Sequence, residues 1–212
     1  MEDLRSAPYS ALLWYWVLTL GFFASLAMPL AEFPEWTWYG LIAVPLLAAS
    51  WAAAKASGYS LKELGLVLDA SPKTILWTVM VGLSGFGLGY LEFRILRPEA
   101  LVIDPSPAKF LVVGVMLMIG TGLTEELIFR GVLQIASIEL FGTGAGILLS
   151  SALFAIMHIG HKSAVDVLFV FAVAIAFGFV VRFSNSLVGV TIAHGLTNIC
   201  LFVFFPNIIG VT

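Results

Sequence analysis

The sequence predicts an all-α fold, a polytopic transmembrane helix bundle of about seven spans with one short interfacial helix. The first observation is composition: of 212 residues, 60% are hydrophobic and only 11% are charged, with a mean hydropathy of +1.05. The second is that long apolar runs alternate with short stretches rich in proline, glycine and charge. A soluble core does not need such runs, but a bilayer about 30 Å thick does.

The spans can be placed from these runs and their breaks. We expect them at residues 10–29, 38–54, 74–91, 110–140, 145–158, 165–182 and 187–205. Leucines recur in the stretch 59–73, which we expect to lie along a membrane surface as the interfacial helix. Residues 92–109 form the longest non-apolar connection and separate two halves. The chain 1–212 is then one integral membrane domain, with spans 1–3 in 1–107 and a motif-bearing core in 108–205.

Charge and the N-terminus bound the location and the partners. The first apolar run is longer than the core of a typical signal peptide, so we expect a retained span and a multi-pass protein of the cell (plasma) membrane. A net charge of −3 gives no nucleic-acid signature, which leaves the lipid bilayer as the expected partner. The orientation stays open, because an inside N-terminus places five cations inside and four outside.

The run 110–140 is too long for one straight span and carries charge. At helical rise it measures about 46 Å, against about 30 Å of hydrocarbon. We therefore expect a strong tilt, or a break at Gly120 to Gly122. Directly afterwards come Glu125, Glu126 and Arg130. A charge at mid-depth costs about 2.5–3.5 kcal/mol on insertion scales, so a task is expected for these residues.

Helical geometry divides these three charges. Glu126 and Arg130 are i, i+4 neighbours and can pair, because arginine stays charged and can donate two hydrogen bonds to a carboxylate. Glu125 points about 100° away and stays free. We interpret the pair as an anchor and Glu125 as the working acid. The alternative is that all three lie near a helix end and snorkel to water.

Two further polar islands lie at i, i+4 spacing on later spans. Phe154 precedes His158, and His194 precedes Asn198. Measured from the side of the turns at 141–144 and 183–186, Glu125, His158, His194 and Asn198 lie roughly 24, 20, 12 and 18 Å deep. They can converge on one cavity. Alternatively, His158 lies at a headgroup interface and His194 and Asn198 are interhelical hydrogen-bond donors.

Other polar residues have simpler interpretations. We expect His161, Lys162 and Asp166 to be interfacial, and Cys200 to be packed. A single cysteine cannot form an internal disulfide.

Taken in order, the three islands resemble the CPBP family. This family holds the type II CAAX prenyl endopeptidases and related bacterial bacteriocin-processing or immunity (Abi) proteins. The resemblance spans about residues 108–205 and is carried by Glu125-Glu126-x-x-x-Arg130, Phe154-x-x-x-His158 and His194-x-x-x-Asn198. The segment LKELGLVL adds a weaker similarity.

The resemblance implies a glutamate-dependent intramembrane endopeptidase that needs no metal or other cofactor. Its substrate would be a membrane-bound or lipid-modified peptide or protein. Glu125 would be the general base, and His158 would be its partner in activating a water. His194 and Asn198 would stabilise the oxyanion. Glu126, Arg130 and Phe154 would support them.

Three other functions remain open at this stage. One glutamate and two histidines could bind zinc, although no HExxH motif is present. The chain could also be a non-catalytic membrane scaffold or bacteriocin-immunity protein. A proton-coupled transporter would use buried acids and histidines too, but the chain shows no inverted halves.

Overall fold

The computed structural model describes residues 34–67, 70–103 and 106–209, and within them every regular element is a helix. The expected all-α class is therefore confirmed. Six helices are long and apolar enough to cross a membrane: Glu35–Ala56, Pro72–Leu96, Pro107–Phe141, Thr143–His161, Ala164–Ser184 and Val188–Ile209. They correspond to the expected spans from 38–54 onward, and the expected span at 10–29 lies outside the described residues.

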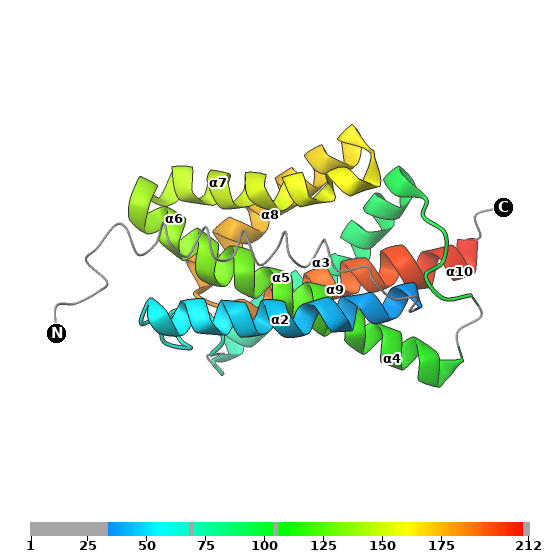
Figure 1. Cartoon of the computed structure of the whole chain (residues 1–212), viewed down its shortest axis with the longest axis horizontal. Coiled ribbons are helices and arrows are strands. Elements are labelled where there is room, and N and C mark those ends of the chain that lie inside the picture. Colours follow the sequence, from blue (N-terminus) through cyan, green and yellow to red (C-terminus); the bar gives the residue numbers. More distant parts are fainter. Residues whose placement is uncertain (1–33, 68–69, 104–105, 210–212) are drawn as a thin grey trace.

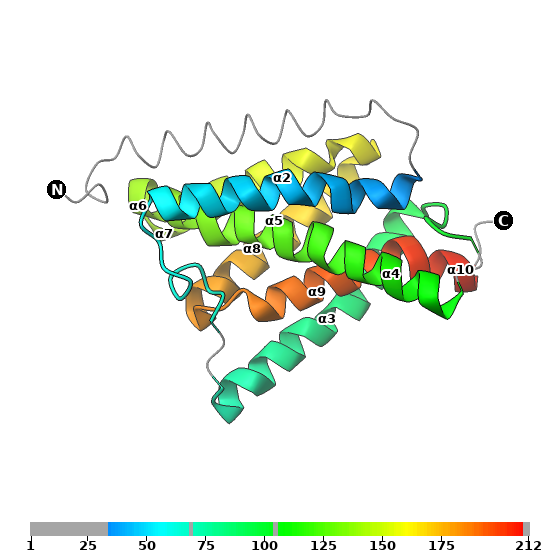
Figure 2. The same cartoon turned by 60° about the horizontal axis from the view of Figure 1, so that its bottom comes forward.

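Most of these helices run along the long axis of the molecule (Figure 1). The α-helical elements that make up these spans are α2 (Glu35–Ala56), α3 (Pro72–Leu96), α4 (Pro107–Leu117), α5 (Thr124–Glu126), α6 (Gln134–Phe141), α7 (Thr143–Ile156), α8 (Ala164–Ser184), α9 (Val188–Ile199) and α10 (Phe205–Ile209). Figure 2 shows α9 beside α3, whose N-terminal end diverges from the bundle. The continuous helical segment Pro107–Phe141, from α4 to α6, is called the rod below, and it crosses between α2 and α9 (Figure 2).

Serine residues begin three of the helices. Ser71 and Ser106 each precede a proline, and each side chain accepts a hydrogen bond from the backbone N–H three residues later. Ser163 does the same for the N–H of Asp166 at the start of α8. Serine at the N-cap and proline at the first helical position are favoured because they satisfy or remove N–H groups that lack helical partners. These caps fix where the spans start.

Glycines bring α3 and α9 into close contact. A Cβ on Gly82 would lie 2.9 Å from Ile192 Cγ2, and one on Gly89 would lie 2.6 Å from Cys200 Cβ. A Cβ on Gly85 would overlap the carbonyl oxygen of Ala193. Gly87 has open space instead. Small residues at a crossing let two membrane helices approach closely, which here positions α3 against α9.

The substitution Gly85→Leu should destabilise the protein far more than Gly87→Leu on the same helix. Overpacking a tight crossing typically costs about 1–3 kcal/mol, and here the obstacle is backbone. Thermal unfolding of the two purified variants in detergent measures the difference. If both variants melt at the wild-type temperature, the α3–α9 crossing is not as close as described.

The long rod Pro107–Phe141 is continuous and does not break at Gly120 to Gly122. Instead, π-helical segments at Met118–Leu123 and Leu127–Leu133 flank α5. The hydroxyl of Thr124 donates to the carbonyl of Ile119, five residues earlier, at 2.7 Å. A π-helical turn leaves carbonyls to be satisfied in this way, and such turns are frequent at functional sites.

The glycines of this segment serve helix crossings. A Cβ on Gly120 would lie 2.6 Å from the carbonyl oxygen of Tyr39 on α2. A Cβ on Gly122 would lie 2.9 Å from that of Thr191 on α9. The rod therefore contacts α2 and α9 closely, immediately before its acidic residues.

The expected interfacial helix at 59–73 is wrong. The described residues of this stretch form turns, and α3 already begins at Pro72. Glu63 accepts hydrogen bonds from the backbone N–H and the hydroxyl of Ser60, and Gly65 adopts a φ of +70°. The carbonyl of Gly65 also accepts from the N–H of Leu187 at 2.8 Å. The leucines fall only partly on one face, so a turn that buries Leu64 is preferred over a surface helix.

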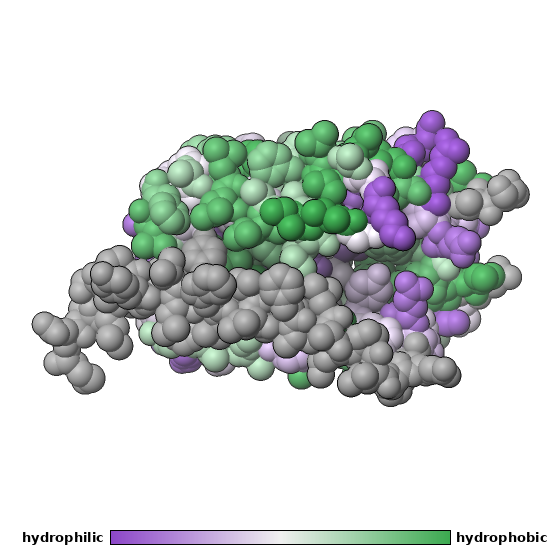
Figure 3. All heavy atoms as spheres, turned by 45° about the horizontal axis from the view of Figure 1, so that its top comes forward, coloured by the Kyte–Doolittle hydropathy of each residue, from purple (hydrophilic) through white to green (hydrophobic). Residues whose placement is uncertain are grey.

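The outer surface matches a lipid environment. Large apolar side chains are exposed along the helices, among them Leu76, Leu111 and Leu168. Figure 3 shows a largely apolar face, with hydrophilic residues gathered towards one end. A soluble protein would not expose so much apolar surface, so the chain is an integral, multi-pass membrane protein.

Candidate active site

Glu126 lies at the centre of a buried polar cluster. Its side chain is fully buried, and its Oε1 accepts a hydrogen bond from Arg130 Nη1 at 2.9 Å. The predicted Glu126–Arg130 contact is thus confirmed. The same oxygen lies 2.8 Å from His194 Nδ1, a contact that the sequence did not indicate. The cluster therefore joins the rod to α9.

This arrangement fixes the orientation of the His194 ring. An ionised carboxylate can only accept, so Nδ1 of His194 carries a hydrogen and donates it to Glu126. The other ring nitrogen, Nε2, lies 3.8 Å from Glu125 Oε2. The Glu125 side chain is 24% exposed, in contrast to Glu126. Adjacent acids on one helix thus occupy two environments, as the sequence predicted from their angular separation.

Arg130 and Phe154 pack against each other and against this cluster. The guanidinium carbon of Arg130 lies 4.3 Å from the centre of the Phe154 ring, within cation–π range. Phe154 also meets His194 edge to face, with ring centres 5.7 Å apart. One aromatic side chain therefore packs against both the anchor cation and the site histidine.

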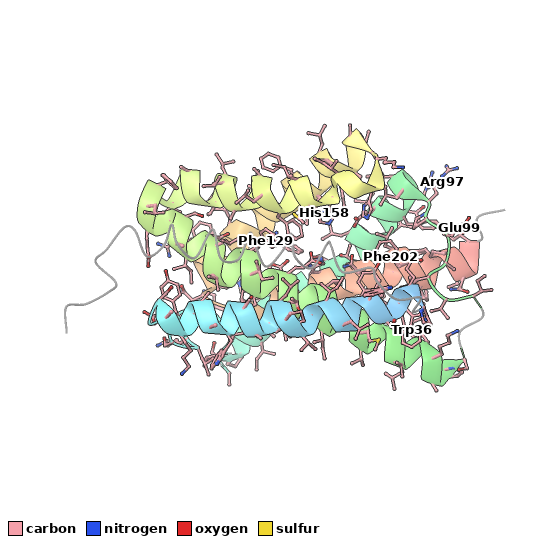
Figure 4. The ribbon with its side chains drawn as sticks, viewed as in Figure 1. Trp36, Arg97, Glu99, Phe129, His158 and Phe202 are labelled. Carbon is pink, nitrogen blue, oxygen red and sulfur yellow. The ribbon has the colours of Figure 1, made fainter. Side chains whose placement is uncertain are left out.

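His158 reaches the site from the 3-10 turn that ends the α7 span. Its Nδ1 donates to the carbonyl of Phe154 at 3.1 Å, so Nε2 of a neutral ring is an acceptor. Figure 4 shows His158 on the α7 side of the bundle, with Phe129 further along its interior. An acceptor in this position can orient a water.

Asn198 is held by the π-helical segment. The hydroxyl of Thr121 donates to the carbonyl of Leu117 at 2.6 Å, and the same oxygen accepts from Asn198 Nδ2 at 2.8 Å. Since the Thr121 proton is used on the carbonyl, the amide must present its NH₂ group to Thr121. The second N–H of Asn198 is then left to donate elsewhere.

A cavity of about 30 Å³ connects these groups and can hold a water. Every sequence-predicted site residue except Glu125 lines it: Glu126, Arg130, Phe154, His158, His194 and Asn198. Glu125 instead faces Nε2 of the His194 ring. The arrangement offers a carboxylate, an oriented histidine and an amide donor around a water-sized space.

Sequence reasoning missed Glu92. It was assigned to the connection 92–109, but it lies in α3, is only 5% exposed and lines the same cavity. The signal was available, because Gly82, Gly85, Gly89 and Glu92 follow each other at helical spacing on one face. Continuing that face beyond Gly89 would have extended the span and pointed Glu92 inward.

The interfacial interpretation of Asp166 is also wrong. Its side chain is fully buried and accepts from His161 Nδ1 at 3.0 Å. His161 itself is 36% exposed and meets His158 edge to face. An acid at the start of α8 is favoured by the helix dipole, and pairing with His161 offsets its burial.

Comparisons with known proteins bear on the segment that holds this cluster. The family model described as type II CAAX prenyl endopeptidase Rce1-like matches residues 107–200. A search of curated proteins and a search of solved structures each gave no match. The matched segment contains the three motifs, and the family is one of proteases. The resemblance to the type II CAAX prenyl endopeptidases drawn from these motifs is therefore confirmed over residues 107–200.

Proposed function

We propose that this protein is an intramembrane glutamic endopeptidase that hydrolyses a peptide bond of a membrane-associated protein or peptide. The observation that supports this most is the position of His194, between the buried Glu126 at 2.8 Å and the partly exposed Glu125 at 3.8 Å. Together with the family match, this favours catalysis over a purely structural cluster.

In this proposal Glu125 is the general base. Two observations support this role: its side chain is 24% exposed, and its Oε2 lies 3.8 Å from Nε2 of His194, the proposed oxyanion donor. Glu125 takes a proton from water as the water oxygen bonds to the carbonyl carbon. In this proposal the water lies between Glu125 and the cavity that His158 and His194 line, and His158 orients it by accepting a hydrogen bond at Nε2. Positioned proton transfer of this kind contributes about 10²–10⁴-fold to the rate.

The oxyanion would be stabilised by His194 and Asn198. When His194 is protonated on both nitrogens, Nδ1–H donates to Glu126 and Nε2–H donates to the oxyanion. The second N–H of Asn198 completes the pair. Removing one such donor typically lowers kcat by about 10²–10³-fold. In this scheme Glu126 is more than an anchor, because it holds the donor ring in place.

Thr121→Val should lower kcat by about tenfold or more while Thr121→Ser stays near wild type. Valine keeps the shape but removes the oxygen that holds Asn198, and small misplacements of such groups are costly. Steady-state kinetics on a peptide substrate, with thermal unfolding alongside, measures this. Equal activity of the valine and serine variants would remove Thr121 from the account.

Two observations support a substrate class: the site lies among helices long and apolar enough to cross a membrane, and the matched family is one of endopeptidases. We infer a membrane-bound or lipid-modified peptide, cleaved in the cell (plasma) membrane, with residues 108–205 forming the catalytic core of a single domain. The name of the family points to prenylated CAAX peptides as the first substrates to test.

Purified protein in lipid nanodiscs provides that test. Quenched fluorescent peptides ending in CAAX, with and without a prenyl group, should reveal cleavage that continues when a strong chelator is added. Loss of cleavage on chelation would favour a metalloprotease. Absence of cleavage for every membrane-anchored peptide offered would favour the alternative, a non-catalytic scaffold or bacteriocin-immunity protein.

A further inference from the structure

One buried acid in the catalytic cavity has no role in the mechanism described so far. Glu92 lines the cavity together with His158, His194 and Asn198. It comes from α3, outside the family match at 107–200. Within the described residues, no hydrogen bond or ion pair joins its carboxyl group to another side chain. A buried acid in a membrane span without such a partner is a functional candidate.

The packing of α3 against α9 explains why Glu92 lines the cavity. The close crossing at Gly85 and Gly89 holds α3 against α9, and Glu92 follows less than one turn later on the same face. Its cavity neighbours include Leu88, Phe169 and Val173, which are apolar. Burying an ionised carboxylate among such groups is costly, so the neutral carboxyl is the favoured form. A neutral carboxyl can donate a proton.

Peptide-bond hydrolysis needs such a donor. The leaving nitrogen must gain a proton as the C–N bond breaks, because an amide anion is a very poor leaving group. Glu125 has taken a proton from water, but it faces Nε2 of His194 and does not line the cavity. Glu92 lies in the cavity itself, beside the groups that would hold the tetrahedral intermediate.

We propose that Glu92 is the general acid of the reaction, an inference that rests on the proposed endopeptidase function. As the tetrahedral intermediate collapses, the C–N bond breaks and the Glu92 carboxyl gives its proton to the departing nitrogen. The proton that Glu125 took from water then passes to Glu92 through a water that bridges Glu125 and the cavity, which restores both acids. The balance is closed: one water and one amide become a carboxylic acid and an amine.

The experiment compares an amide with an aryl ester at the same position of one peptide. A phenolate departs without protonation, so the ester needs the base but not the acid. Glu92→Gln should lower amide cleavage by about 100-fold, within the usual range for proton transfer, and leave ester cleavage within about threefold. Glu99→Gln, an exposed acid just beyond α3, is the matched control and should change neither.

Two results would overturn the proposal. Glu92→Gln could lower amide and ester cleavage equally, which would mean a structural role, or could leave both unchanged. If the glutamine variant does not fold, Glu92→Asp should keep a measurable amide rate while lowering the amide-to-ester ratio. An unchanged ratio would count against the proposal. Failure of the endopeptidase function itself looks different, because wild type would then cleave neither substrate.

Discussion

Replacing Glu125 by glutamine is expected to lower kcat for peptide cleavage by about 10²–10⁴-fold, because the variant loses the group that takes the proton from water. The fold should persist. The glutamine has nearly the same shape, the side chain is partly exposed, and the pairs of Glu126 with Arg130 and His194 are untouched. Steady-state kinetics in nanodiscs, with thermal unfolding of the same preparations, measures both quantities.

Glu35→Gln is the control for this experiment. Glu35 is an exposed acid at the start of α2, and its loss should leave kcat and the unfolding temperature unchanged. A Glu125→Gln enzyme that retains wild-type kcat would remove Glu125 as the base. The cluster would then have to act through another acid or serve structure alone.

Replacing Arg130 by methionine should destabilise the protein by about 3–5 kcal/mol, because it leaves Glu126 buried without its cation. Arg130 is only 2% exposed and also covers the ring of Phe154, so its loss removes packing as well as charge. Denaturant or thermal unfolding in detergent measures the loss of stability. Activity should fall in parallel, because His194 depends on the same Glu126 oxygen.

The double variant Glu126→Gln/Arg130→Met separates charge from packing. Removing both charges should recover a large part of the lost stability, since no uncompensated acid remains in the interior. Activity should stay low because His194 loses its carboxylate partner. An Arg130→Met protein that is fully stable yet inactive would indicate that Arg130 contacts the substrate.

Much of the fold could be predicted because its signals are local. Hydropathy locates the six spans that the structure describes, and i, i+4 spacing predicts the Glu126–Arg130 pair. The glycines of α3 are another local signal, because small residues at helical spacing favour a close helix crossing. The π-helical segments around α5 could not be predicted, because they depend on how the rod packs against α2 and α9.

The contacts between distant helices were the part that sequence could not supply. The Glu126–His194 contact joins residues 68 positions apart, and it depends on how two helices rotate against each other. Glu92 was missed because three charged residues close to the end of α3 made the span look shorter than it is. Polar residues near a span end resemble a loop by composition, although one of them faces the interior.

The most direct test of the central claim is a comparison of new protein N-termini in two membrane preparations. One contains the wild-type protein and the other contains Glu125→Gln at equal abundance, and both are incubated with a chelator. The account predicts a set of membrane-protein or peptide N-termini that appears only with the wild type. Identical sets of N-termini in the two preparations would contradict the assignment as a glutamate-dependent intramembrane protease.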